Sequence, residues 1–280
     1  MKKYLKALIT GIIVTLLLAV FMLKITMNFQ VILFFGAAIF FVAGVLNKNS
    51  SLNIFVTTVL ITIIYLGLFV FTVLEEIPTL WYMVPVFFAS ALLGLLYKTH
   101  KIKAIWGIAL LVLVMTAIAV LLIPNSLESS LTQTRFDKLP QFTIQNMDGT
   151  TTDSESLKGK VVVLDFFGTW CKPCVLELKE LDKVKAAFKD DNTVVFYIVN
   201  ADVADTPKKF KAFIDKNSYS FNFAYDQDSK IYKLLELQKA GLPALLIIDK
   251  EQHIRLQHIG YNPAETNFTE AMIQTINSLK

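Results

Sequence analysis

Five long apolar stretches fill the first half of the chain. They cover residues 5–23, 29–46, 52–74, 80–97 and 102–123, and their only charged residues are Lys6 and Lys103, each near a stretch end. As helices, they are long enough to cross a bilayer core of about 30 Å. The pattern predicts an all-α membrane domain of five transmembrane helices over residues 1–123.

Lysines are distributed unevenly between the loops that join these stretches. One set of ends carries Lys2, Lys3, Lys6, Lys48, Lys98, Lys101 and Lys103, whereas the opposite loops carry Lys24 and the acidic pair Glu75/Glu76. Positive residues favour the cytoplasmic side, so we expect a cytoplasmic N-terminus. An odd number of spans then places the second half outside the cytoplasm, on the periplasmic face of a bacterial inner membrane.

The first apolar stretch follows lysines, as a signal peptide would. It has no small-x-small cleavage site near Val20-Phe21-Met22-Leu23, and four more stretches follow it, so we expect an uncleaved span. The spans offer little chemistry, because their polar residues, such as Thr57, Thr58, Thr62 and Ser90, can bond to the helix backbone. We expect an anchor or a docking platform in the lipid bilayer. Gly36, Gly44, Gly67 and Gly94 could mark close helix contacts, but small residues are common in such spans, so no role is assigned to them.

The second half of the chain has a different periodicity. After Pro124, residues 124–138 are rich in Ser, Thr and charge and are expected to form an extracytoplasmic tether. Residues 139–280 then alternate between strand and helix patterns. The expected elements are a hairpin over 142–149, strands at 161–166, 193–200 and 221–225, helices to 189, from 207, and at 231–237, a hairpin at 244–260 and a helix at 263–279. This order predicts an α/β fold with a mixed central sheet and helices on both faces.

Composition narrows the function. The 280 residues are 54% hydrophobic and 18% charged, too apolar for one soluble domain, and the excess lies in the first half. The net charge of +4 comes from scattered lysines, so a nucleic-acid partner is not supported. The chain has two cysteines, Cys171 and Cys174, so any thiol chemistry must use this one pair.

The cysteine pair lies where a strand pattern gives way to a helix pattern. Val161-Val162-Val163-Leu164 precedes it and Val175, Leu178 and Leu181 follow at helical spacing. At a helix start, unpaired N–H groups and the helix dipole stabilise a thiolate, which favours Cys171 as the attacking thiol, with Lys172 beside it. Cys174 falls one turn inside the helix, and Pro173 is tolerated in the first turn.

The segment Trp170-Cys171-Lys172-Pro173-Cys174, together with Gly241-Leu242-Pro243, resembles the thioredoxin superfamily, and its flanks resemble the membrane-anchored TlpA/ResA-like branch. Supporting marks are Lys158-Gly159-Lys160, Phe167-Gly168-Thr169-Trp170 and Leu246-Ile247-Ile248-Asp249. The resemblance covers residues 139–280. It implies a thioredoxin-like fold and a thiol-disulfide oxidoreductase whose redox group is the Cys171–Cys174 disulfide, with no further cofactor.

The resemblance also implies roles for neighbouring residues. Trp170, Lys172 and Pro173 would form the contact surface around the attacking sulfur. Pro243 would be cis and receive substrate backbone, and Leu242 would shape an edge where an extended substrate can pair. A core role for Trp170 is the alternative.

Two acidic residues accompany the cysteines. Asp165 interrupts an apolar strand, and a buried carboxylate is costly unless paired or protonated. Its position matches the aspartate that in thioredoxins takes the proton of the second cysteine. Glu177 lies three residues after Cys174, on the same helical face, and matches a glutamate of ResA-like proteins that tunes the pair. The alternatives are a strand-edge Asp165 and a solvated Glu177 like Glu180.

Other uses of the cysteines are less well supported. A zinc site would need ligands from His253 and His258, with His100 across the membrane, so we expect no metal. A structural disulfide across so short a loop would stabilise little. A peroxiredoxin-like activity is disfavoured because Leu164 replaces the proline of the Pro-x-x-x-Thr-x-x-Cys pattern and Thr169 is displaced.

Two functions remain. The first is reduction of disulfides in exported proteins, such as apocytochrome c, through attack by Cys171 and resolution by Cys174. The second is a redox-sensing or docking module for an integral membrane protein. Residues 1–138 contain no cysteine, so the spans cannot relay electrons by thiol exchange. A separate reductant, such as a membrane thiol relay, is therefore expected.

Overall fold

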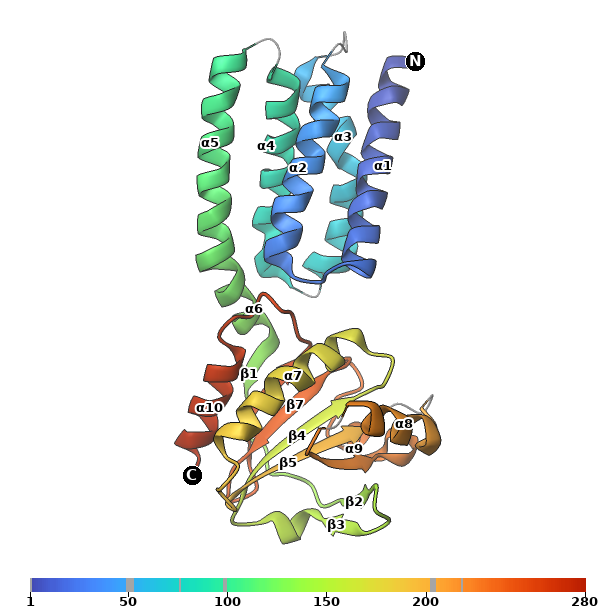
Figure 1. The fold of residues 1–280 in the computed structure, drawn as a ribbon, viewed down its shortest axis with the longest axis vertical. Coiled ribbons are helices and arrows are strands. Elements are labelled where there is room, and N and C mark those ends of the chain that lie inside the picture. The colour runs from blue at the N-terminus through green and yellow to red at the C-terminus, as the bar shows by residue number, and fades with distance from the viewer. Residues whose placement is uncertain (1, 49–52, 76, 98–99, 202–204, 218) are drawn as a thin grey trace. The chain divides into compact units, whose positions relative to one another are not determined.

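The structure is a computed structural model that describes residues 2–48, 53–75, 77–97, 100–201, 205–217 and 219–280. Leu52, Glu76 and Lys98, which enter the predicted spans and loop charges, lie outside the described residues. The chain divides into two compact units, Met1–Ser130 and Leu131–Lys280 (Figure 1).

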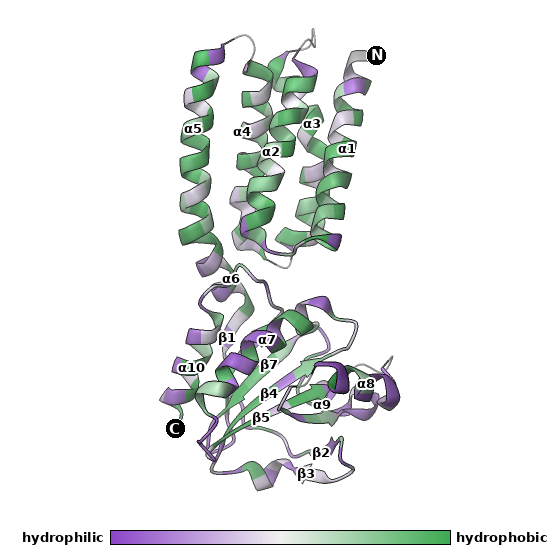
Figure 2. Cartoon of the chain, viewed as in Figure 1, coloured by the Kyte–Doolittle hydropathy of each residue, from purple (hydrophilic) through white to green (hydrophobic). Residues whose placement is uncertain are grey.

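The first unit consists of long helices that match the predicted spans. They are α1 (Lys2–Lys24), α2 (Phe29–Asn47), α3 (Ile54–Phe69) with a π-helical turn at Val70–Leu74, a 3-10 turn at Pro78–Tyr82 leading into α4 (Met83–Leu96), and α5 (Lys101–Ala117), which continues through Ile118–Leu122 into α6 (Ile123–Leu131). Five helical stretches are long and apolar enough to cross a membrane. Figure 2 shows them almost uniformly hydrophobic along their length.

Helices that follow one another in the sequence of this unit run in opposite directions (Figure 1). At one end Lys6 at the start of α1 donates to the carbonyl of Leu46 at the end of α2, at 3.0 Å. At the other end Gln30 of α2 donates to the carbonyl of Ala119 at 2.8 Å. The start of α1, with Lys6, and the end of α2, with Lys48, therefore lie on the same side of this unit.

Several polar residues of the spans are hydrogen-bonded within their own helices, and two of the glycines allow helices to pack closely. The hydroxyls of Thr57, Thr58, Thr62 and Ser90 each donate to the carbonyl four residues earlier, at 2.8–3.0 Å. A Cβ added to Gly44 or Gly94 would come within 2.1 Å of a backbone carbonyl on the facing helix. These two glycines thus allow the α2 and α4 backbones to touch, a role that the sequence alone left unassigned.

The segment expected to be a tether has regular structure instead. Residues 124–131 continue the helix as α6, and β1 (Thr132–Thr134) pairs antiparallel with β8. Lys138 also forms an isolated bridge with His253. Without β1, the outer edge of β8 would leave backbone groups unpaired, and a Thr-rich segment pairs well there. The tether prediction for 124–138 is corrected accordingly.

The second unit is built on one eight-stranded sheet with the order β1-β8-β7-β4-β5-β6-β2-β3. Its other strands are β2 (Thr143–Asn146), β3 (Thr151–Asp153), β4 (Val161–Phe167), β5 (Val194–Asn200), β6 (Asn222–Tyr225), β7 (Ala244–Ile248) and β8 (Ile254–Ile259). Strands β4, β5 and β6 are parallel, whereas β7, β8, β1, β2 and β3 join antiparallel. The mixed sheet and both predicted hairpins are confirmed.

Helices cover both faces of this sheet, as predicted. The helices α7 (Lys172–Ala187), α8 (Pro207–Asn217) and α10 (Phe268–Ser278) pack on one face, around Phe167, Leu178, Phe210 and Phe268. The short helix α9 (Lys230–Leu234) and the segment after it pack on the other face, through Ile231, Leu235 and Leu237. The last helix is shorter than expected, because residues 263–267 form turns before it.

Candidate active site

The two cysteines lie at the junction of β4 and α7. Cys171 is the N-cap of α7, and its Sγ accepts a hydrogen bond from the Cys174 backbone N–H at 3.2 Å. The two side chains form a disulfide with Cα atoms 5.3 Å apart. A sulfur at this position receives the unpaired N–H groups of the first turn, so the helix start would stabilise a Cys171 thiolate once the bond is reduced.

The residues around Cys171 form the accessible surface of the site. Trp170 is 62% exposed, and Lys172 is also exposed. Pro173 and Leu242 are half-buried, and Leu242 packs against the core cluster that contains both cysteines. The Leu242–Pro243 peptide bond is cis, as predicted. The high exposure of Trp170 argues against a core role for its ring.

Asp165 lies in the centre of the sheet. It is fully buried in β4, which pairs with β5 on one side and β7 on the other. Side chains alternate along a strand, so Asp165 shares the α7 face with Val163 and Phe167. Within the described residues its carboxyl oxygens have no hydrogen-bond partner, and burial raises its pKa well above the usual range. The strand-edge alternative is wrong.

Glu177 is equally buried, on the face of α7 that holds Cys174. Both of its carboxyl oxygens also lack a hydrogen-bond partner in the described part of the chain. Burial raises its pKa well above the usual range, and the nearby charges of Asp165 and Glu265 raise it further. The two predicted acids are therefore brought together behind the disulfide, and the solvated alternative for Glu177 is wrong.

Asp205 is a further site residue that sequence reasoning missed. Its buried carboxylate accepts hydrogen bonds from the Thr169 N–H at 2.7 Å, the Thr169 hydroxyl at 2.6 Å and the Asn200 amide at 2.8 Å, and Lys209 lies 2.5 Å away. Burial opposes its ionisation, but the hydrogen bonds from Lys209, Thr169 and Asn200 outweigh burial and lower its pKa. Asp205 thus holds the loop that presents Trp170 and Cys171. The sequence signal that could have identified Asp205 is its position between the apolar strand at 193–200 and the helix that starts at Pro207.

The histidines have separate environments. His258 is fully buried in β8, and burial lowers its pKa to about 4. The side chain of His253 is 44% exposed and lies 3.7 Å from Asp249. Within the described residues, no group of three or more His, Cys, Asp or Glu side chains is arranged to hold a metal ion.

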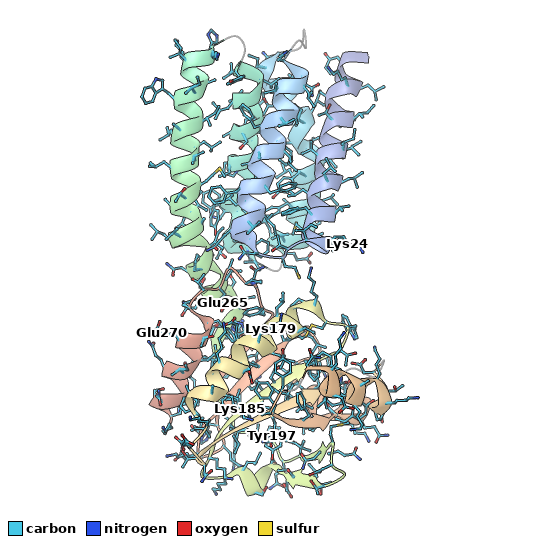
Figure 3. All side chains as sticks on the ribbon, viewed as in Figure 1. Lys24, Lys179, Lys185, Tyr197, Glu265 and Glu270 are labelled. Carbon is cyan, nitrogen blue, oxygen red and sulfur yellow. A yellow bond between two sulfur atoms is a disulfide. The ribbon has the colours of Figure 1, made fainter. Side chains whose placement is uncertain are left out.

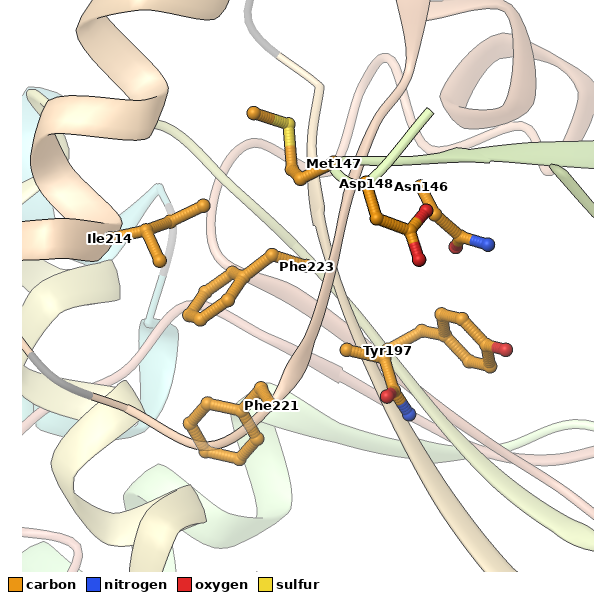
Figure 4. A pocket seen from close by; sticks show the side chains of 8 residues that line it. Asn146, Met147, Asp148, Tyr197, Ile214, Phe221 and Phe223 are labelled. Carbon is orange, nitrogen blue, oxygen red and sulfur yellow. The ribbon is translucent and has the colours of Figure 1, made fainter. Parts of the chain in front are cut away.

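A separate hollow of about 300 Å³ lies between β2, β5, β6 and α8. Figure 4 shows the rings of Tyr197, Phe221 and Phe223 and the side chain of Ile214 around it, with Asp148 at its polar side. None of its lining residues comes from α7 or from the loop that holds the cysteines. It is therefore not a part of the disulfide site.

Known proteins resemble the second unit. A model of the AhpC/TSA family matches residues 136–257. The thiol-disulfide oxidoreductase ResA of Bacillus thuringiensis (strain Al Hakam) is 30% identical over 126 residues, which are 45% of this chain and 70% of that protein. The thioredoxin-like protein YneN of Bacillus subtilis (strain 168) is 29% identical over 124 residues, 43% of this chain and 69% of that protein.

Among solved structures, a Chlorobium tepidum protein described as a thiol:disulfide interchange protein DsbE aligns with a TM-score of 0.46 at 29% identity, covering 52% of this chain and 96% of that one. The ResA relative is matched over 70% of its length. Cys171 and Cys174 form a disulfide at the start of α7, and Leu242, which precedes the cis Pro243, packs against the core cluster that contains both cysteines. This chain belongs to the ResA/TlpA-like thiol-disulfide oxidoreductases of the thioredoxin superfamily.

Proposed function

We propose that this oxidoreductase is anchored in the bacterial cell membrane by its five apolar helices and reduces disulfides of exported proteins outside the cytoplasm. The observation that carries the reaction is the Cys171–Cys174 pair at the start of α7 with Asp165 and Glu177 buried behind it. The uneven lysine distribution supports a cytoplasmic N-terminus and an extracytoplasmic second unit.

The first chemical step uses Cys171. In the reduced enzyme its thiolate attacks one sulfur of the substrate disulfide, the substrate S–S bond breaks, and the other substrate sulfur leaves as a thiolate. A mixed disulfide now joins Cys171 to the substrate. Stabilisation by the α7 N-terminus makes Cys171, rather than the more enclosed Cys174, the attacking thiol.

The second step uses Cys174 and an acid. The Cys174 thiol gives its proton to the Asp165 carboxylate, with Glu177 as the neighbouring acid, and the resulting thiolate attacks the Cys171 sulfur. The Cys171–Cys174 bond forms, and the substrate leaves as its second thiolate. One substrate disulfide is reduced, and the enzyme is oxidised to the disulfide form.

Substrate contact involves the surface beside Cys171. The exposed ring of Trp170, with Lys172 and Pro173, offers a platform for an unfolded chain, and the Leu242–Pro243 edge offers backbone pairing for an extended segment. Apocytochrome c and other exported thiol proteins fit this requirement, because they present an accessible disulfide in an extended chain.

Electrons must reach the disulfide from a second molecule. Residues 1–138 contain no cysteine, so we infer a separate reductant, such as a membrane thiol relay that docks on the spans. To test this, the oxidised full-length protein in vesicles would be offered a thiol reductant on the cytoplasmic face alone. We expect no reduction; reduction without a second protein would mean that the spans carry electrons by a non-thiol carrier.

The experiment that tests the function as a whole is turnover of a model-peptide disulfide by the full-length protein in lipid nanodiscs with a thiol reductant. We expect multiple turnovers, and Cys174→Ser should stop them while trapping substrates as mixed disulfides on Cys171. Reversible oxidation of the pair without substrate turnover would favour the sensor or docking module instead.

The side of the membrane on which the second unit lies can be tested separately. A reporter active only outside the cytoplasm, fused after Lys280, is expected to be active. Activity of a cytoplasm-only reporter at the same position would contradict the orientation or the number of spans.

A further inference from the structure

A row of four residues crosses the sheet from the buried acid to the sheet edge. Asp165 of β4 is paired with Leu245 of β7, Leu245 with His258 of β8, and His258 with Thr132 of β1. Directly paired residues of antiparallel strands point to the same face, with Cβ atoms about 4.5–5.5 Å apart. All four side chains therefore lie on the face that α7 and α10 cover, and β1 is the edge strand.

Two buried glutamates come from the elements that cover this face of the sheet. Glu177 comes down from α7, and Glu265 comes from the turn that leads into α10, where Figure 3 labels it. Both are buried, at 0% and 4% exposure. The charges of Asp165 and Glu265 both act on Glu177, so Glu177 lies near both of these acids. Leu245 separates Asp165 from His258 in the sheet, whereas Glu177 lies near Asp165 and Glu265 lies near His258.

In the outer half of the row, His258 is hydrogen-bonded to Thr132 and lies close to Glu265 without a hydrogen bond between them. The Nε2 atom of His258 lies 3.5 Å from Oε2 of Glu265, and Nδ1 lies 2.9 Å from the hydroxyl of Thr132. The His258 ring is fully buried against Phe268, whereas Thr132 is partly exposed. Buried ionisable groups therefore extend from Asp165 at the centre of the sheet to His258, and His258 contacts Thr132, which reaches the surface.

Other ionisable groups face this region from the packed elements. Tyr261, in the segment after β8, lies near Glu177, Glu180 and Glu265, and its pKa is raised by burial and by those three charges. Glu180, one turn further along α7, is bonded to Lys183 and Thr269. The phenol of Tyr261 stays protonated, and Glu180 is engaged elsewhere, so neither competes for the proton of the inner acids.

We propose that Glu265 and His258 carry the proton released by Cys174 from the Asp165–Glu177 pair to the Thr132 edge of the sheet. The inference rests on the proposed function, because it supplies the proton path for the second step of that reaction. Glu265 and His258 are positioning residues for this transfer and do not touch the substrate.

The step balances without a further reactant. Cys174 gives up one proton, and Asp165 takes it as the Cys171–Cys174 bond forms and the substrate thiolate leaves. The proton then moves through Glu177 and Glu265 to His258, which returns it to water at Thr132. Asp165 is a carboxylate again when the reductant restores the dithiol. Burial raises the pKa of both inner acids, which makes the Asp165 carboxylate a stronger base for the Cys174 proton. Burial also lowers the pKa of His258 to about 4, so the ring passes the proton to water at once and does not retain it.

Rapid mixing of the reduced full-length protein, in nanodiscs, with an aromatic disulfide that releases a coloured thiolate at each cleavage tests the path. The first release reports attack by Cys171, and the second reports resolution by Cys174. We expect Glu265→Gln and His258→Gln to slow the second release at least about tenfold and to leave the first unchanged, since groups that transfer protons directly contribute about 10²–10⁴-fold. Imidazole should restore the second release in His258→Ala.

The pH profile separates proton transfer from packing. Glu265→Gln removes a charge that raises the pKa of Glu177, so the profile of the second release should move to lower pH. Matched controls are Glu270→Gln, on the outer side of α10 in Figure 3, and His253→Gln, both at exposed side chains and both expected to behave as the wild type.

An unchanged second release and pH profile in the folded variants would overturn the path. Equal slowing of both releases, with no rescue by imidazole, would do the same, because it would indicate a packing defect. If Glu265→Gln does not fold, the His258 variants decide alone. A wild-type protein that shows no second release would instead contradict the proposed function.

Discussion

The buried threonines of α3 in the helical unit are hydrogen-bonded within their own helix, whereas the acids beside the disulfide have no such partner among the described residues. Thr58 and Thr62 are enclosed in α3, and each hydroxyl donates to the carbonyl of the preceding turn at 2.9–3.0 Å. Asp165 and Glu177 are enclosed to the same degree, and no described residue bonds to their carboxyl oxygens. A buried polar group without a partner costs free energy, so its retention points to chemistry rather than to packing.

The two units also differ in the residues that fix their close contacts. In the helical unit, Gly44 and Gly94 allow the α2 and α4 backbones to touch, because neither residue has a side chain. In the second unit, Asp205 holds the Thr169 loop through hydrogen bonds, and what it contributes is the placement of Trp170 and Cys171. The helical unit is thus specified by packing, and the catalytic unit by packing together with a few enclosed charges.

The largest expected effect comes from Asp165→Asn. Asparagine keeps the shape but does not accept the Cys174 proton, so resolution of the mixed disulfide should slow about 100-fold while its formation is unchanged. Stopped-flow kinetics of the two steps measures this. Equal slowing of both steps would indicate a packing effect, and unchanged resolution would shift the proton acceptor to Glu177.

Asp205→Ala should have the next largest effect. It leaves the Thr169 N–H, the Asn200 amide and the Lys209 ammonium without their shared acceptor, which should destabilise the second unit by about 2–3 kcal/mol. Denaturant unfolding of the full-length protein in detergent measures this. Lys211→Ala is the matched control, because Lys211 forms an exposed ion pair on α8, the helix that carries Lys209. This substitution should destabilise the protein by less than about 1 kcal/mol. Similar losses in both variants would contradict the special role of Asp205.

The pH dependence of the free energy of unfolding reports directly on the buried Glu177. The folded pKa of Glu177 is raised above its unfolded value of about 4.5, so its stabilising effect is fully present below pH 4.5 and is lost as pH rises toward the folded pKa. Glu177→Gln removes this loss, and the variant should therefore gain stability relative to the wild type as pH rises from about 4 to 7. Unfolding at several pH values tests this; a constant difference would show that Glu177 ionises freely.

The smallest effect is expected in the helical unit. Thr58→Val replaces a hydroxyl that bonds only to its own helix, so the free energy of unfolding should change by less than about 1 kcal/mol at every pH. Thermal unfolding in detergent measures it. A large or pH-dependent change would contradict the comparison, because it would reveal a functional polar group among the spans.

The sequence by itself determined the division into an apolar helical half and an α/β half, the sheet with helices on both faces, and the cysteine pair at a helix start. These features follow from local patterns: apolar length, the change from strand to helix periodicity, and a motif of adjacent residues. It also identified Asp165 and Glu177, because a carboxyl inside an apolar strand or one turn from Cys174 stands out locally.

Only the tertiary structure decided which distant residues meet. Residues 132–134 join the sheet because β8 had an open edge, which no pattern within the expected tether reveals. His258 comes next to Glu265, and Glu265 near Glu177, only through strand register and the turn before α10. Asp205 reaches Thr169 across 36 residues. Such contacts depend on the packing of elements far apart in the chain, and periodicity carries no information about that packing.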